Sequence, residues 1–254
     1  MTNDLAGRSA VVTGGGSGIG RAVVASLAAA GAVVIAADLE QDSAQDSIAR
    51  LSAPPAGSRG TFLDVTDDAS VAQCFALAEA AGGPAEIVVN CAGVSLGDSG
   101  DGAAHEVSPA AWERTIAVNL TGTFLVCRAA LPGMLELNRG VIINIASLGA
   151  LVGIGLHAYS ASKGGVVSLS RSLAVTYGQY GIRCNALAPG PIETPMTSDM
   201  LTDPGRRQAR LATIPAGRAG TPAEVAALVR YLVSDEAGFV TGGVFSIDGG
   251  AAAL

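Results

Sequence analysis

The chain has 254 residues, of which 49% are hydrophobic and 15% charged, and its formal net charge is -7. A chain this long and apolar can bury a large core and still present apolar surface to another subunit. Its acidity argues against nucleic acid as a partner, because an acidic protein repels phosphate backbones.

Seven short apolar runs recur in chain order, at 9–13, 32–37, 61–65, 86–90, 140–147, 182–188 and 244–248. Most of them lack polar alternation, which is typical of strands covered on both faces of a parallel sheet. Ala-rich segments with helical spacing separate them, at 18–30, 67–81, 108–136, 158–178 and 221–234. This alternation predicts a Rossmann-like α/β fold, a doubly wound, mostly parallel seven-stranded sheet with helices on both faces. No Pro/Gly/Ser linker divides the chain, so we expect one domain over 1–254.

Several features bear on the compartment. The first residues show no basic segment followed by an apolar stretch, so we expect no signal peptide. The apolar stretch 22–37 has 16 residues, short of the about 20 that a membrane span needs, and Gly31 interrupts it. Four scattered cysteines without a CxxC pair are typical of reduced thiols in a cytoplasmic protein. With two histidines and no acidic cluster, we expect no metal site.

A glycine-rich loop, TGGGSGIG, follows the first predicted strand and opens the first predicted helix. Gly14 permits the tight turn, Gly18 lets the backbone approach a pyrophosphate, and Gly20 lets the helix pack closely on the sheet. The N-terminus of that helix offers N–H groups to phosphates. The loop therefore predicts a nucleotide cofactor.

Asp38 ends the second predicted strand, about 20 residues after the glycines, where an acid can bind ribose hydroxyls. A carboxylate there repels a 2′-phosphate, and the nearby positions hold Ser17 and Leu39 rather than a cation. The pattern favours NAD over NADP. On this evidence alone, a methyltransferase that binds its cofactor's ribose through the same acid remains an alternative.

Tyr159 and Lys163 lie four residues apart, on one face of a predicted helix. A free tyrosine has a pKa near 10, and lowering it to about 7 takes about 4 kcal/mol. A positive charge about 4 Å away supplies about 4 kcal/mol at an effective dielectric constant near 20. Lys163 is therefore expected to lower the pKa of Tyr159 enough to make it a usable base.

Taken together, these motifs resemble the short-chain dehydrogenase/reductase family, in its single-domain form of about 250 residues. The cofactor loop resembles the family's TGxxxGxG, and NCAG (90–93) resembles its NNAG with Cys91 in place of the second Asn. PGPIET (189–194) resembles the segment over the nicotinamide, and TGGVFSIDGG (241–250) the C-terminal strand. The family's catalytic tetrad is matched by Asn119, Ser147, Tyr159 and Lys163.

The resemblance implies a role for each of these four. Tyr159 is the implied general acid/base, and Lys163 lowers its pKa and holds the nicotinamide ribose. Ser147 is implied to bind the substrate oxygen, and Asn119 to hold a water that links Lys163 to solvent. The implied reaction interconverts a secondary alcohol and a ketone, with hydride transfer to or from the nicotinamide.

The cofactor contacts implied in the same way follow the chain. They lie on the phosphate loop, at the adenosine, and at the nicotinamide: Gly14, Ser17, Gly18, Ile19 and Gly20; Asp38, Asp64, Val65, Asn90 and Gly93; and Tyr159, Lys163, Pro189, Gly190, Ile192 and Thr194. Asp64 is implied to accept a hydrogen bond from the adenine amino group. The neighbouring Asp67 fits a helix N-cap better.

Substrate specificity is expected from the loop 93–108 and a substrate lid at about 190–215. The lid carries Met196 and Met200, and His157 precedes the tyrosine at the edge of the expected cleft. Apolar residues between 148 and 156 indicate a mostly apolar or cyclic alcohol, although Arg206, Arg207 and Arg210 keep a carboxylate substrate open.

Two alternatives remain at this point. One is a 3-oxoacyl-thioester reductase of the same family, acting on an acyl carrier protein or CoA ester, and the other is a non-catalytic nucleotide-binding homologue. The resemblance also implies a homotetramer with 108–136 and 158–178 as subunit faces.

Overall fold

The computed structural model describes residues 4–97, 100–198 and 202–254. Its centre is a seven-stranded sheet in the order β3-β2-β1-β4-β5-β6-β7, and every neighbouring pair in it is parallel. The fold is therefore Rossmann-like, as predicted. The strands are β1 (Ser9–Thr13), β2 (Val33–Asp38), β3 (Arg59–Phe62), β4 (Ile87–Asn90), β5 (Gly140–Ile145), β6 (Ile182–Pro189) and β7 (Val244–Ile247).

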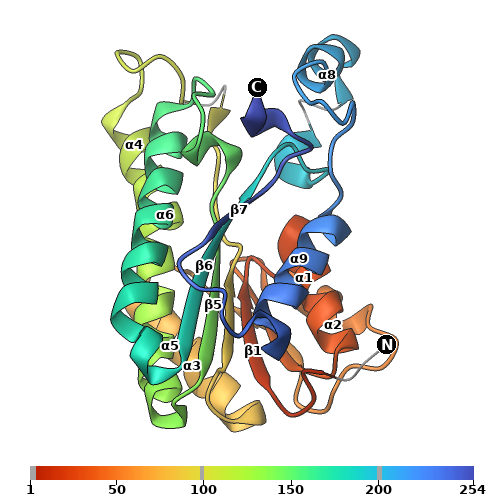
Figure 1. The fold of residues 1–254 in the computed structure, drawn as a ribbon, viewed down its shortest axis with the longest axis vertical. Coiled ribbons are helices and arrows are strands. Elements are labelled where there is room, and N and C mark those ends of the chain that lie inside the picture. Colours follow the sequence, from red (N-terminus) through yellow and green to blue (C-terminus); the bar gives the residue numbers. More distant parts are fainter. Residues whose placement is uncertain (1–3, 98–99, 199–201) are drawn as a thin grey trace.

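Helices cover both faces of this sheet (Figure 1). One face is covered by α1 (Gly18–Ala29), α2 (Gln41–Ala49) and α9 (Pro222–Val233). The other is covered by α3 (Asp68–Gly82), α5 (Thr123–Leu137) and α6 (His157–Tyr177). Two shorter helices, α4 (Pro109–Ile116) and α8 (Pro204–Leu211), lie near the end of the molecule where the strands finish.

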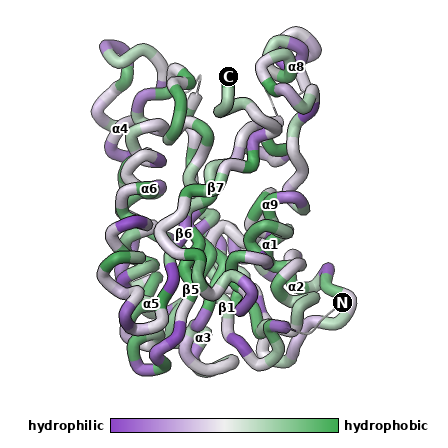
Figure 2. The backbone as a smooth tube through the Cα atoms, in the orientation of Figure 1, coloured by the Kyte–Doolittle hydropathy of each residue, from purple (hydrophilic) through white to green (hydrophobic). Residues whose placement is uncertain are grey.

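The two-sided burial follows from the period of a strand. Ala10 and Val12 of β1 belong to the core under α1 and α9, whereas Val11 belongs to the core under α3 and α5. Successive side chains point to opposite faces, so an unbroken Val/Ala run supplies both cores. Figure 2 shows the resulting hydrophobic colouring along the central strands.

The strand order changes direction between β1 and β4, which creates a crevice at their carboxyl ends. The chain passes from β1 outward to β2 and β3 and then returns to β4 on the other side of β1. Gly14, Asp38 and Cys91 follow or end three of these strands and reach the same edge of the sheet.

Several predicted boundaries were wrong. The third apolar run forms a strand only at Arg59–Phe62, because Leu63 and Val65 turn away to line a pocket. The helix predicted over 108–136 is divided by a π-helical turn at Ala117–Gly122. Two helices, α2 and α8, were not predicted. By contrast, Asp67 does cap α3, since its side chain accepts a hydrogen bond from the Ala69 N–H at 3.0 Å.

One helical stretch in the described residues, Pro109–Leu137, is long and apolar enough to cross a membrane by length and composition. Its inner side, however, packs within the fold, where Val126, Leu131 and Met134 join the core against β4 and β5. This packing accounts for the apolar character of the stretch.

Candidate active site

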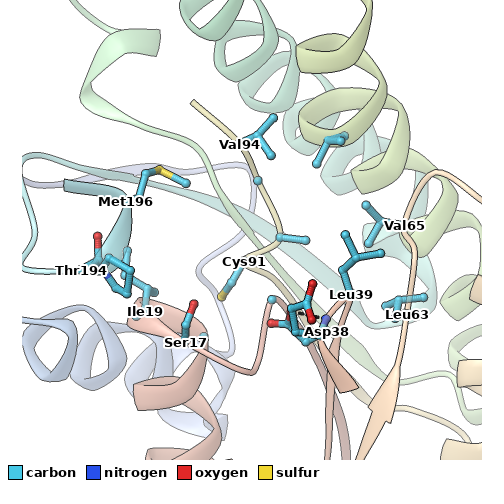
Figure 3. Close-up of a pocket in the computed structure, with 18 of the residues that line it drawn as sticks. Ser17, Ile19, Asp38, Leu39, Leu63, Val65, Cys91, Val94, Thr194 and Met196 are labelled. Atoms are coloured by element: carbon cyan, nitrogen blue, oxygen red, sulfur yellow. Dashed lines mark hydrogen bonds between the residues drawn. The ribbon is translucent and has the colours of Figure 1, made fainter. Parts of the chain in front are cut away.

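A cavity of about 330 Å³ opens at the carboxyl ends of β1, β2 and β4. Figure 3 shows its length: Leu39, Leu63 and Val65 lie at one end, Asp38 and Ser17 in the middle, and Thr194 and Met196 at the other. The predicted cofactor residues that line it are Gly14, Ser17, Gly18, Ile19, Gly20, Asp38, Asp64, Val65, Gly93 and Thr194. Residues more than 150 positions apart in the sequence thus share one elongated pocket.

At two positions of the glycine-rich loop, Gly14 and Gly20, the backbone favours or requires glycine. Gly14 has a φ of 63°, a left-handed conformation that favours glycine. A Cβ on Gly20 would overlap the carbonyl oxygen of Gly14, which shows how closely α1 approaches the end of β1. Ser17 precedes α1 and makes no side-chain capping hydrogen bond. The start of the helix therefore faces the cavity with backbone N–H groups, an arrangement suited to phosphates.

Asp38 is held at the end of β2 by the same loop. Its Oδ2 accepts a hydrogen bond from the Gly16 N–H at 2.9 Å, and its Oδ1 accepts one from the Glu40 N–H at 3.1 Å. The nearest arginine on α1, Arg21, donates to the Gly16 carbonyl and pairs with Asp46 at 3.2 Å. The carboxylate thus faces the cavity while the adjacent cation is committed to other partners.

The end of the cavity beyond Asp38 is a slot with apolar walls. Leu39, Leu63 and Val65 line it, together with Asp64 and Arg114. Hydrogen bonds from Thr66 lower the pKa of Asp64, with a smaller contribution from Arg114. Because Asp64 Oδ1 accepts from both the side chain and the backbone of Thr66, this carboxylate has a fixed orientation at the slot.

Asn119 lies within the π-helical turn and is fully buried. Its Oδ1 accepts from the Val94 N–H at 2.8 Å, and its Nδ2 donates to the Val94 carbonyl at 2.9 Å and to Ser162 Oγ at 3.1 Å. Ser162 in turn donates to the Tyr159 carbonyl at 2.7 Å. The side chain expected to hold a water is therefore occupied by protein partners, and it joins the loop after β4 to α6. π-Helical turns are frequent at functional sites.

Tyr159, Ser147 and Lys163 meet beside the cavity, at the carboxyl end of β5. Ser147 is two residues past the strand, and its side chain hydrogen-bonds Tyr159. Lys163 Nζ lies 5.7 Å from the centroid of the Tyr159 ring and donates to the Ile145 carbonyl at 2.8 Å. A Cβ on Gly93 would lie 3.4 Å from Lys163 Nζ and 3.3 Å from Asn119 Oδ1. Gly93 of the cavity lining therefore lies beside Lys163 and Asn119, and Ser147 and Tyr159 adjoin Lys163.

The expected effect of Lys163 on Tyr159 is not found in this structure. Burial raises the pKa of Tyr159 above its ordinary value, and the hydrogen bond with Ser147 acts in the opposite direction. Burial also lowers the pKa of Lys163 to about 8, opposed by the nearby Cys91 thiol. Burial is the larger of the two effects on the pKa of Tyr159, and the Lys163 ammonium donates to the Ile145 carbonyl.

Other predicted contacts lie outside the cavity lining. Asn90 is 3% exposed, and its Nδ2 donates to Asn144 Oδ1 at 2.8 Å, so its side chain joins β4 to β5 rather than facing the adenosine. Pro189 is the last residue of β6, and Gly190 and Ile192 follow it; the cavity lining includes none of the three, and Gly190 donates its N–H to the Ile247 carbonyl.

The predicted lid contributes Thr194, Pro195 and Met196 to the pocket, while α8 lies further out. Met200 lies outside the described residues. His157 begins α6, and its Nδ1 lies 2.5 Å from the Gly102 carbonyl oxygen, so it contacts the loop after β4.

Sequence reasoning missed several pocket residues. Leu39, Leu63, Cys91, Val94, Arg114 and Val118 all line the cavity without having been predicted as contacts. The apolar residues directly beside Asp38 and Asp64 could have been predicted as pocket residues, since side chains that flank acids at strand ends border the same crevice. Arg114 carried none, because its position depends on how α4 packs. Among the described residues, no group of three or more metal-binding side chains is placed to hold an ion.

Known proteins of this architecture match the chain over nearly its full length. The family model described as enoyl-(acyl carrier protein) reductase matches residues 14–252. The 2-(S)-hydroxypropyl-CoM dehydrogenase 3 of Xanthobacter autotrophicus is 42% identical, with 100% of each chain covered. The (3R)-3-hydroxyacyl-CoA dehydrogenase of Mus musculus is 40% identical over 98% of this chain and 99% of its own. The crystal structure of levodione reductase superposes with a TM-score of 0.92 at 35% identity, covering 98% of this chain and 99% of its own.

Proposed function

Because the chain belongs to the short-chain dehydrogenase/reductase family and is an oxidoreductase of that family, we propose that it is an NAD-dependent enzyme interconverting a secondary alcohol and a ketone. The observation that carries the proposal is the meeting of Ser147, Tyr159 and Lys163 beside a cavity whose middle holds Asp38. Tyr159 and Lys163 would move the proton and Asp38 would bind the cofactor's ribose, so a reaction that transfers both a proton and a hydride can take place in this crevice.

The cavity suits the pyrophosphate and the adenosine half of the cofactor. The close glycine crossing at Gly14 and Gly20 leaves room for a pyrophosphate, and the apolar slot at Leu39, Leu63 and Val65 suits a flat adenine ring. Asp38 would accept hydrogen bonds from the adenosine ribose hydroxyls and would repel a 2′-phosphate. When bound, the nicotinamide supplies the hydride acceptor or donor.

In the proposed mechanism, the protein handles the proton. For ketone reduction, Tyr159 donates its phenolic proton to the substrate oxygen, which also accepts a hydrogen bond from Ser147. Burial favours the protonated phenol that this direction requires. For alcohol oxidation, Tyr159 acts as phenolate, and a positive charge on Lys163 would stabilise it. Asn119 would hold Tyr159 in register with the loop after β4 through Val94 and Ser162.

The test is a panel of secondary alcohols, including cyclic and carboxylate-bearing ones, offered with NAD and with NADP and read by absorbance of the reduced cofactor. We expect turnover with NAD and a kcat at least about 100-fold lower for Tyr159→Phe, the usual scale of acid/base catalysis. A Phe variant as active as wild type would refute the mechanism.

A second candidate substrate class is a 3-hydroxyacyl or 3-oxoacyl thioester. The (3R)-3-hydroxyacyl-CoA dehydrogenase of Mus musculus, at 40% identity over 98% of this chain, favours it. Adding 3-hydroxybutyryl-CoA to the same panel separates the two classes by kcat/KM.

We also propose a homotetramer in the cytoplasm. Exposed apolar side chains on α5 and α6 support an assembly through these helices, since Phe124 is 44% and Val175 is 85% exposed. The free thiols of Cys74, Cys91, Cys127 and Cys184 fit a reducing compartment. Light scattering that gives a monomer at micromolar concentration would contradict the assembly.

A further inference from the structure

Asp101, on the loop after β4, is bonded to the first turn of α6. Its Oδ1 accepts from the Ala158 N–H at 3.0 Å, and its Oδ2 accepts from the Tyr159 N–H at 2.8 Å. The residue is 4% exposed, a degree of burial that is rare for a carboxylate. Both carboxylate oxygens of this buried acid therefore accept hydrogen bonds from backbone N–H groups, one at the proposed acid/base residue and one at the residue before it.

The helix has no cap of its own at this end. Leu156 occupies the N-cap position and makes no side-chain hydrogen bond to the helix. The backbone N–H groups of the first turn would normally donate to a local Ser, Thr, Asp or Asn. Here they donate to Asp101, which lies 57 residues before Ala158. The adjacent Gly102 carbonyl contacts His157 Nδ1, so two consecutive loop residues hold the start of α6.

The other side of the Tyr159 peptide is held as well. Its carbonyl accepts from Ser162 Oγ, which accepts from Asn119 Nδ2, and Asn119 in turn is bonded to Val94 at the beginning of the same loop. The loop after β4 is thus joined to Tyr159 twice, through Val94 and through Asp101. This loop also borders the cavity at Val94.

We propose that Asp101 is a positioning residue for the reaction: by accepting both N–H groups, it sets the Tyr159 backbone and couples the loop beside the substrate cleft to the acid/base group. The inference rests on the proposed function of Tyr159. An error of about 1 Å in the place of a catalytic group can cost about 100-fold in rate, so a backbone anchor here bears directly on kcat.

The test is Asp101→Asn, which keeps the size of the side chain but replaces one acceptor with a donor that faces an N–H group. We expect kcat with the alcohol found in the panel to fall by about 10- to 100-fold. The dissociation constant for NAD, measured by fluorescence of the full-length protein, should stay within about twofold, because Asp101 does not line the cofactor cavity. Amide exchange at 157–160 should become faster.

Glu106→Gln is the matched control, since it removes an exposed acid from the same loop, and that acid pairs with the exposed His105. It should leave kcat, KM and amide exchange at wild-type values. Asp101→Ser, which retains one acceptor oxygen, should give an intermediate kcat and serves as the second variant if Asn fails to fold. Rates are normalised to the concentration of NAD-binding sites, so partial unfolding does not lower them.

The proposal is overturned if either folded variant has a kcat within twofold of wild type, or if neither folds, because the carboxylate would then act on stability. Failure of the proposed function gives a different result. In that case the wild-type protein itself turns over no alcohol or thioester in the panel.

Discussion

Lys163 donates a hydrogen bond to the carbonyl oxygen of Ile145 at 2.8 Å, which ties α6 to the carboxyl end of β5. The lysine is 5% exposed, and burial lowers its pKa to about 8. Burying an ammonium costs free energy, which its hydrogen bond to this carbonyl offsets only in part. Its place beside Tyr159 and Gly93 is the one that the proposed catalytic role requires.

Lys163→Met should lower kcat by about 100- to 1,000-fold, the scale for loss of one preorganised electrostatic group. The difference in unfolding free energy between the wild type and this variant should depend on pH. An unfolded lysine titrates near 10.4, so from pH 8 to 10.4 the unfolded chain binds more protons and the folded wild type gains stability as pH rises. Relative to the Met variant, that gain should reach roughly 3 kcal/mol by urea unfolding. A pH-independent difference would contradict a buried, titrating Lys163.

The two directions of the reaction should respond oppositely to pH. Burial raises the pKa of Tyr159, so the phenol remains protonated at neutral pH and is ready to donate. Ketone reduction should therefore be flat near neutrality and fall at higher pH, whereas alcohol oxidation should rise with pH as phenolate forms. Initial rates from pH 6 to about 11 in both directions check this, a range that passes the ordinary tyrosine pKa near 10. Parallel profiles would exclude Tyr159 as the shared acid/base.

Asp38 should decide between the two nicotinamide cofactors. In Asp38→Ser combined with Leu39→Arg, the carboxylate is removed and a cation is placed at the ribose. We expect kcat/KM with NADP to rise by about 10- to 100-fold, since two unit charges about 5 Å apart interact by about 3 kcal/mol at an effective dielectric constant near 20. The control, Leu39→Arg alone, retains the repulsive acid and should gain much less. A wild-type preference for NADP would overturn this prediction.

Asn144 should contribute to the free energy of unfolding rather than to the reaction itself. It is fully buried, and its amide joins three elements: Nδ2 donates to Ser170 Oγ of α6 at 2.9 Å, and Oδ1 accepts from Asn90 of β4 at 2.8 Å. Asn144→Ala should cost about 1–3 kcal/mol, because it leaves buried polar partners unsatisfied. Urea unfolding measures the loss.

Ser168→Ala, an exposed change on α6, the helix that carries Ser170, provides the comparison and should be nearly neutral. Asn144→Ala and Ser170→Ala together should lose less than the sum of the single changes, since they share one hydrogen bond. Strict additivity would mean that the two side chains do not interact in solution.

Most of the fold could be predicted from the sequence, because the apolar runs report strand burial directly. The Val and Ile residues of 140–145 are typical of a strand covered on both sides, and the helical spacing between runs implies crossovers. The boundaries at Leu63 and at Ala117–Gly122 escaped prediction. A buried strand and a buried loop have the same composition, and a π-helical turn has no compositional signature.

The sequence by itself determined which residue types are present for chemistry: Asp38 after the glycine loop, and Tyr159 four residues before Lys163. Only the tertiary structure decided where their charges point. It directs Lys163 to Ile145, turns Asn90 into the core, and caps α6 with Asp101 from 57 residues away. Spacing along a helix fixes which side chains share a face, whereas the partner of each polar group depends on which distant backbone atoms packing brings within about 3 Å.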